Sequence, residues 1–219
     1  MLKGIRPGAT AGYAGTIACL LFLGSAANLK ADTILGNLPV TNDSTPTVIG
    51  GQFVKAIGFT LSPGQNYNLT QLTLRLAGFS VGRVPVVTLR ENVGGADPGA
   101  NVLVQFSNPP AQGNDYFNYA FTPASPFTLL ANTKYWLVVS ESAGTIAWSA
   151  SIPSVTPSGV AVLNNNRLST DGGLSYGDSA RFNNFQLEGT PVVNPVPEAS
   201  SALFLLGAVA VAARLRKDR

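Results

Sequence analysis

Carboxylates are the side chains on which catalysis in this chain would have to depend, because none of its 219 residues is a histidine. Without imidazole, Ser-His-Asp and Cys-His nucleophilic mechanisms are excluded, and so are zinc, iron and copper sites with histidine ligands. A carboxylate-dependent glycoside hydrolase remains, and it needs two carboxyl groups about 5 to 10 Å apart across a cleft. The candidates are Glu91, Asp97, Asp115, Glu141, Asp171, Asp178 and Glu188. These residues fall mostly at expected turns and strand ends, where acidic side chains are common, so we expect no catalytic residues and no enzymatic activity.

Two loops in the last third of the chain are rich in oxygen ligands. Asn165 lies within three consecutive asparagines, residues 164–166, and Asp171 and Asp178 enclose a glycine-rich loop. Hard cations such as Ca²⁺ prefer oxygen ligands of this kind. Clusters of Asn, Asp and Gly are also ordinary turn residues, and the spacing of an EF-hand is absent. A structural calcium ion at Asn165, Asp171 and Asp178 is therefore one hypothesis, and loops without a metal are the other; we expect no other cofactor.

Aromatic side chains could bind sugars if they are exposed on a β-sheet domain. The candidate carbohydrate-binding residues are Tyr116, Trp148 and Tyr176. Tyr176 lies in the glycine-rich loop of residues 172–177, so we expect it to be exposed. Trp148, like Trp136, alternates with apolar neighbours, and core packing is the favoured interpretation for both tryptophans.

These candidates must be positioned by β-strands, because a period of two runs through nearly all of residues 32–190. Leu72, Leu74 and Leu76, for example, alternate with polar residues, which is typical of a half-buried strand. Turn-forming Gly, Pro, Asn and Asp separate such segments, and no stretch of the body has a sustained helical period. We expect strands at 56–61, 72–76, 84–91, 102–106, 116–122, 127–130, 135–140, 146–150, 160–163 and 182–187. The pattern predicts an all-β, single-domain antiparallel β-sandwich of Greek-key or jelly-roll type.

Two tyrosines share a spacing that bears on this topology. Tyr67 and Tyr135 each follow a leucine by six residues, Leu61 and Leu129, across a polar turn. This is the arrangement of a tyrosine corner, in which the hydroxyl group bonds to backbone a few residues upstream. Two corners favour a Greek-key or jelly-roll arrangement, although two hairpins can also share such a spacing by chance.

The charge of the chain is uneven. The whole chain carries a formal charge of +3, but residues 32–197 contain seven basic and nine acidic residues, a net charge of −2. The excess of basic residues therefore belongs to the two ends, and we expect no nucleic-acid partner. The single cysteine, Cys19, lies before the body, so the body contains no disulfide bond.

The N-terminal segment has the form of a secretory signal peptide. Residues 1–31 contain Lys3 and Arg6, then an apolar stretch at 17–23, then small residues. We expect export through the secretion machinery and cleavage by signal peptidase, after either Ala27 or Ala31.

The C-terminal segment has the form of a short membrane anchor. Residues 199–213 carry no charge, and the basic tail of residues 214–219 follows them. Fifteen residues would span about 22 Å as a helix, less than the roughly 30 Å of a bilayer core, and local thinning and snorkelling could close much of that gap. We expect a single transmembrane helix with its basic end in the cytoplasm, the alternative being a core helix of the folded body.

This C-terminal layout resembles the PEP-CTERM sorting signal that exosortases recognise in Gram-negative bacteria. In that family a short Pro-Glu-Pro-like motif, within a linker here at 191–198, precedes a membrane helix and a basic cluster. The matching residues are Pro197, Glu198, Arg214, Arg216, Lys217 and Arg219. Ala199 stands where the family has its second proline. The resemblance implies an exosortase as partner, transient or permanent attachment to the membrane, and delivery to the cell surface or medium.

The body resembles the choice-of-anchor ectodomains, type R in particular. The resemblance is carried by residues 51–53, 72–76, 131–137, Trp148 and 185–189. It implies an extracellular sandwich without a common activity. We therefore expect a structural or adhesive protein of the cell surface or extracellular matrix, associated with extracellular polysaccharide. The alternative is a carbohydrate-binding module, and the least favoured function is the glycoside hydrolase.

Overall fold

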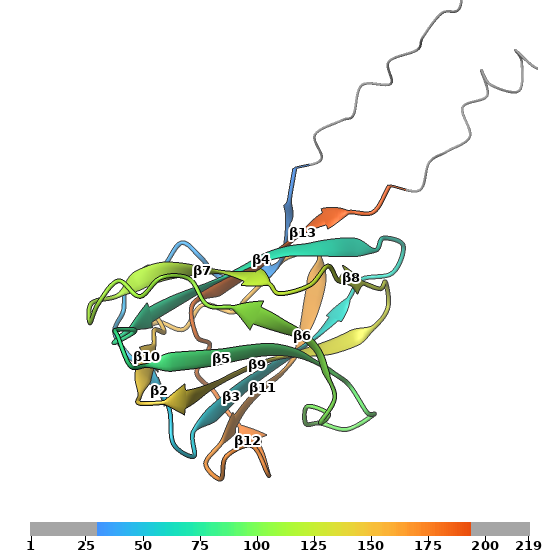
Figure 1. The fold of residues 1–219 in the computed structure, drawn as a ribbon. Helices are drawn as coiled ribbons and strands as arrows, with labels where there is room; N and C mark the ends of the chain where they lie inside the picture. Colours follow the sequence, from blue (N-terminus) through green and yellow to red (C-terminus); the bar gives the residue numbers. More distant parts are fainter. Residues whose placement is uncertain (1–29, 194–219) are drawn as a thin grey trace, which may run out of the picture.

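The computed structural model describes residues 30–193, which form one curled, antiparallel β-sheet without helices (Figure 1). The thirteen strands are β1 (Asp32–Gly36), β2 (Thr47–Ile49), β3 (Val54–Leu61), β4 (Tyr67–Ala77), β5 (Val84–Glu91), β6 (Val102–Ser107), β7 (Phe117–Pro123), β8 (Thr128–Leu129), β9 (Lys134–Ala143), β10 (Ile146–Trp148), β11 (Ala161–Ser169), β12 (Gly177–Asp178) and β13 (Phe185–Pro191). The prediction of an all-β, antiparallel body is confirmed. The membrane helix expected at 199–213 and nearly all of the signal peptide expected at 1–31 lie outside the described residues. Among the described residues, no helix is long and apolar enough to span a membrane.

The sheet folds over on itself, so that two sets of strands face each other. Its strand order is β1-β13-β4-β7-β6-β5-β9-β3-β11-β12. Strands β13, β4 and β7 lie above β5, β9 and β3 in Figure 1, and β6 connects the two sets through its pairing with β7 and β5. Strand β10 pairs with both β2 and β4 at one end of the body. Each set therefore has one inner face, toward the other set, and one outer face.

The core lies between the two inner faces. Leu72, Leu74 and Leu76 on β4 are fully buried, and they belong to the same apolar cluster as Leu137 and Val139 on β9. Burial of each such side chain stabilises the fold by about 1.5 to 3 kcal/mol relative to its exposure in water. The alternation seen in the sequence thus places apolar residues on the inner faces.

All ten expected strands overlap strands of the structure, and three further strands were missed. The missed strands are β1, which pairs with β13, and the short strands β2 and β12, which contain three and two residues. Strand β11 is longer than expected, because it continues through residues 164–166, which had the composition of a turn. A bulge between Leu163 and Asn165 admits the extra residue into the pairing with β3.

The tyrosine-corner prediction is confirmed at Tyr135 and wrong at Tyr67. The backbone N–H of Leu130 donates a hydrogen bond of 2.8 Å to the hydroxyl oxygen of Tyr135, five residues downstream. The hydroxyl group of Tyr67 instead lies beside the carboxylate of Asp32, and burial together with that charge raises the pKa of Tyr67. Tyr119, which the sequence analysis did not select, accepts a hydrogen bond from the N–H of Gln112.

Candidate functional site

Trp136 lies on the outer face of the β5-β9-β3-β11 set, away from the main core. It belongs to a second, smaller apolar cluster with Val54, Ala56 and Val138, and it is fully buried there. Its six-membered ring rests on the backbone of Gly58 in β3, where a Cβ atom would come within 3.0 Å of the ring carbons. Trp136 is buried on an outer face because two loops, residues 92–101 and 170–178, cover its ring.

Two cations hold these loops over Trp136. Lys134 places its Nζ atom 4.6 Å from the centroid of the Trp136 ring and donates a 2.7 Å hydrogen bond to Oδ1 of Asn165. Arg167 donates to the carbonyl oxygen of Ala96 and forms a 2.8 Å ion pair with Asp178. Burial, with a smaller contribution from the nearby Arg167, lowers the pKa of Lys134. We call Lys134, Trp136, Asn165, Arg167 and Tyr176 the outer-face cluster.

The structure does not bring the three calcium candidates together. Asn165 uses its side-chain oxygen for Lys134, and Asp178 uses its carboxylate for Arg167. Asp171 accepts hydrogen bonds from Ser175 and other groups of its own loop, which lower its pKa to about 2. No group of three acidic or cysteine ligands occurs in residues 30–193. The structure therefore gives the calcium hypothesis no support: Lys134 and Arg167 contact oxygens of Asn165 and Asp178, and Asp171 is bonded within its own loop.

The three carbohydrate candidates lie apart. Tyr176 is half-buried against the outer-face cluster, rather than fully exposed as expected. Tyr116 is also half-buried, but it lies near Arg75 of β4, in the other set of strands, with the guanidinium carbon 5.9 Å from the ring centroid. Trp148 is fully buried in the main core and donates from Nε1 to the carbonyl oxygen of Asn184. The prediction of a sugar-binding Trp148 is therefore wrong, because no ligand can reach its ring.

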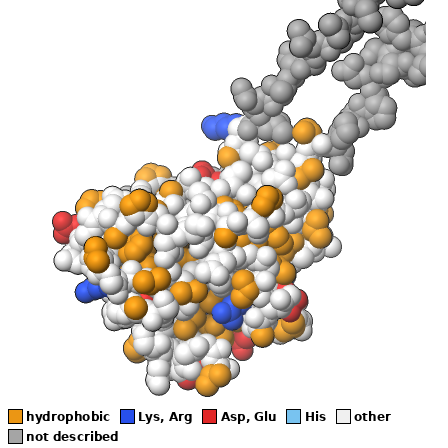
Figure 2. Space-filling view, viewed as in Figure 1, with side chains coloured by type: hydrophobic (Ala, Val, Ile, Leu, Met, Phe, Trp, Pro, Cys, Tyr) orange, Lys and Arg blue, Asp and Glu red, His pale blue; other side chains and the backbone are white. Residues whose placement is uncertain are grey.

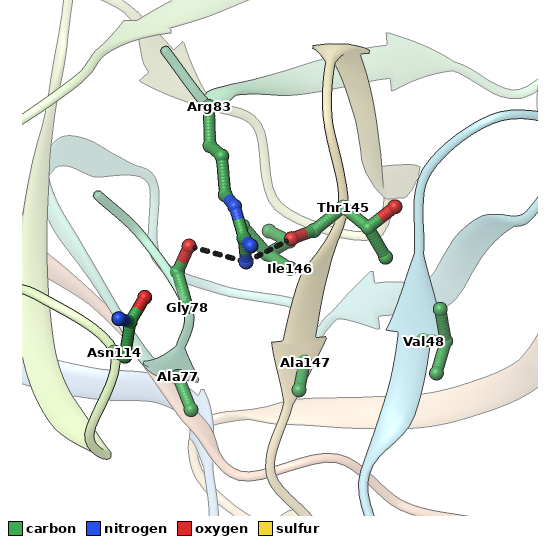
Figure 3. A pocket seen from close by; sticks show the side chains of 8 residues that line it. All are labelled: Val48, Ala77, Gly78, Arg83, Asn114, Thr145, Ile146 and Ala147. Atoms are coloured by element: carbon green, nitrogen blue, oxygen red, sulfur yellow. Dashed lines mark hydrogen bonds between the residues drawn. The ribbon is translucent and has the colours of Figure 1, made fainter. Parts of the chain in front are cut away.

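A hollow of about 450 Å³ opens at the end of the body where β10 meets β2 and β4. Its lining residues are Val48, Ala77, Gly78, Arg83, Asn114, Thr145, Ile146 and Ala147. Arg83 extends into it and donates hydrogen bonds to the carbonyl oxygens of Gly78 and Thr145, at 2.9 and 2.7 Å (Figure 3). Arg83 thereby joins two loops through its Nη1 atom.

Charge is sparse over the rest of the visible surface. On the face drawn in Figure 2, basic and acidic side chains are few and lie apart, and apolar side chains are scattered among uncharged polar atoms. No contiguous charged patch is visible on this face.

No protein-family model matches the chain, and no curated protein matches it either. Function is therefore inferred from the sequence and the geometry described above. The outer-face cluster contains cations paired with amides and carboxylates around a covered ring. Such an arrangement fixes the two loops over the ring and leaves Tyr176 half-exposed at its edge.

Proposed function

We propose that the protein is an exported cell-surface or extracellular-matrix protein with a structural or adhesive role. Its body is a β-sandwich of jelly-roll type, and an exosortase sorts and cleaves it through the C-terminal signal. Pro197, Glu198, Arg214, Arg216, Lys217 and Arg219 make up that signal and lie outside the described residues. The secretion machinery and signal peptidase act first, and the helix at 199–213 holds the body at the membrane until cleavage.

The observation that carries this proposal is the pairing of the first and last strands. Asp32 of β1 pairs with Gly189 of β13, and Thr33 pairs with Glu188 (Figure 1). The chain therefore enters and leaves the folded body side by side, at one end of the sheet. A domain tethered by its C-terminal end is then attached at a single point, and its opposite end projects away from the membrane. This geometry suits a surface module that is presented on a tether and released by one cut.

The covered loops support a structural role for the body. Residues 92–101 and 170–178 are tied down by the ion pairs and hydrogen bonds of Lys134 and Arg167. The body reaches this order without cysteines in residues 32–197. A module of this kind can serve as a scaffold within extracellular polysaccharide.

The mature C-terminus provides the test of this proposal. We expect intact-mass and peptide mass spectrometry of surface and medium fractions to find a chain ending near Pro197 or Glu198. The control is a chain with residues 197–219 removed, which should reach the medium without a membrane-bound stage. Full-length protein that ends at Arg219 and stays in the membrane would contradict cleavage, and cytoplasmic protein that keeps Met1 would contradict export.

The second candidate function is a carbohydrate-binding module, and the half-exposed ring of Tyr176, packed against the apolar cluster of Trp136, favours it. We expect Tyr176→Ala to reduce retention on the host's extracellular polysaccharide by about tenfold, the equivalent of about 1.4 kcal/mol for a lost stacking contact. Tyr116→Ala is the matched control, because Tyr116 is equally half-buried but lies on the other set of strands. If a pull-down assay retains both variants and the unaltered protein equally, Tyr176 does not bind the polysaccharide, and the structural role is the remaining proposal.

A further inference from the structure

Lys55 is a buried lysine that the proposed function does not use. It shares the inward side of β3 with Ile57 and Phe59, and it is 0% exposed. Its Nζ atom lies 2.6 Å from Oγ of Ser179 and 3.0 Å from the carbonyl oxygen of Arg181. Among residues 30–193, no carboxylate forms an ion pair with it. A buried amine without an acidic partner is expensive to keep charged.

The surroundings of Lys55 favour its neutral form. Burial lowers its pKa to about 7, and the like charge of Arg181 acts in the same direction. On the neighbouring strand β9, Glu141 lies two residues beyond the partner of Lys55, and the cation that lowers its pKa is Arg83, against the larger effect of burial. On β11, Arg167 is paired with Asp97 and Asp178 on the outer face. Near neutral pH a large share of the molecules therefore has an uncharged Nζ, which can accept a proton.

The hydroxyl group beside this amine is open to a ligand. Ser179 is half-exposed and lines a hollow of about 350 Å³ between β11 and the segment after β12. The other lining residues are Leu163, Asn164, Asn165, Asn166, Asp178, Ala180 and Phe182. Lys55 lies behind Ser179 and is itself fully buried.

Two further groups in the wall of this hollow lack partners. Oδ1 of Asn166 is buried without a hydrogen bond within the described part of the chain, although its Nδ2 donates to the carbonyl oxygens of Ser179 and Arg181. In that same part of the chain, the backbone N–H of Ala180 donates no hydrogen bond. The N–H of the residue after a nucleophile is a common oxyanion donor.

We propose that Ser179 is a nucleophile for acyl transfer and that Lys55 is its general base. Oγ of Ser179 attacks the carbonyl carbon of a short acyl ester, while Nζ of Lys55 takes the hydroxyl proton. The ester bond breaks, the alcohol leaves with that proton, and an acyl-serine remains. Water, deprotonated by the same amine, then releases the carboxylic acid and restores Ser179. The lack of histidine excludes histidine-based triads, but it does not exclude a mechanism in which a lysine is the base.

The lining defines the class of substrate. Three neutral amides and one carboxylate disfavour a long acyl chain and a second negative charge, whereas they can bond the hydroxyl groups of a carrier. A small, uncharged acyl ester of a hydroxyl-rich carrier fits these walls best. Acetyl esters are the simplest members of this class.

The test uses the full-length protein in mild detergent and a serine-reactive fluorophosphonate probe, with the modified residue identified by peptide mass spectrometry. We expect Ser179 to be labelled at least tenfold faster than any other serine, and 4-nitrophenyl acetate to be hydrolysed. Ser179→Ala should abolish both, and Ser175→Ala, which removes another hydroxyl group bonded to a charged side chain, should change neither. Absence of labelling at Ser179, or equal labelling of other serines, would overturn the proposal.

The role of Lys55 is separated from folding by a second measurement. General-base catalysis contributes about 10²- to 10⁴-fold, so Lys55→Met should slow labelling by at least tenfold while the far-ultraviolet spectrum is retained. Because Lys55→Met also changes the packing around β3, the unaltered protein is titrated as well: its labelling rate should rise with pH, with a midpoint near 7. A rate without such a midpoint would show that the amine of Lys55 is not the base.

Discussion

Replacing Trp148 with alanine is expected to lower the free energy of unfolding by about 3 to 5 kcal/mol, as large-to-small changes of buried aromatic residues do. Trp148 is 0% exposed, and its ring meets that of Phe185 edge to face at 6.2 Å. Its Nε1–H donates a 2.9 Å hydrogen bond to the carbonyl oxygen of Asn184, which would lose this donor. Removal of the ring therefore leaves both a cavity and a weakened polar contact.

The position of Trp148 adds to this effect. It pairs with Thr47 of β2 and with Leu76 of β4, so it lies where β10 bridges two strands. The amide of Asn183 donates to the carbonyl oxygen of Trp148 and to the hydroxyl group of Thr47, which extends the same buried network. Loss of the ring is expected to loosen this end of the body as a unit.

Urea unfolding followed by circular dichroism measures the change. Trp148→Phe keeps most of the apolar volume and loses only the N–H, so its loss should be well below that of the alanine variant. Val162→Ala is the control, because this exposed side chain on β11 should change the stability by less than about 0.5 kcal/mol. A loss below about 1 kcal/mol for Trp148→Ala would contradict the central place of Trp148 in the core.

Periodicity was sufficient to predict the strands and the core because both follow from alternation along the chain. It indicated that Trp148 packs in the core, and the structure confirms this. The same alternation could not show that Trp136, also fully buried, is buried on an outer face. Its cover comes from residues 92–101 and 170–178, and no local pattern connects these loops to β9.

The candidate site was predicted only where its residues are close in sequence. Asn165, Asp171 and Asp178 do lie near one another along the chain, but their oxygens face Lys134, Arg167 and their own loop. The spacing of these residues along the sequence could not show that Lys134 and Arg167 contact their oxygens. The contact between Lys55 and Ser179 joins residues 124 positions apart, so sequence reasoning based on motifs had no means of finding it.

Lys55 also makes the stability of the protein depend on pH. Its pKa falls from about 10.5 to about 7 on folding. Between these two values the unfolded chain binds more protons than the folded one, so the free energy of unfolding rises with pH across this window. Below about pH 7 both states hold the proton, and the contribution becomes constant. A difference of about 3.5 pKa units corresponds to about 5 kcal/mol between the two ends of the window.

Lys55→Met is expected to remove this dependence and to raise the free energy of unfolding at pH 6 by about 2 kcal/mol. The gain is smaller than the full effect of burial, because Ser179 and the carbonyl oxygen of Arg181 lose a donor. That carbonyl oxygen keeps its bond from Asn166, which limits the loss. Urea unfolding of both proteins from pH 6 to pH 10 tests this, since other titrating groups contribute equally to the two profiles and cancel in their difference.

Parallel profiles would show that the amine of Lys55 titrates normally in the folded state and would remove the physical basis for a neutral base beside Ser179. Profiles that cross, with the variant more stable at pH 6 and the unaltered protein more stable near pH 10, would show that the protein keeps a buried amine at the expense of stability at low pH. A methionine would fill the same space without that cost. Residues that lower stability in this way are expected at sites of function, where a group must be held in an unfavourable state to react. The pH dependence of folding and the reactivity of Ser179 therefore measure the same amine in two independent ways.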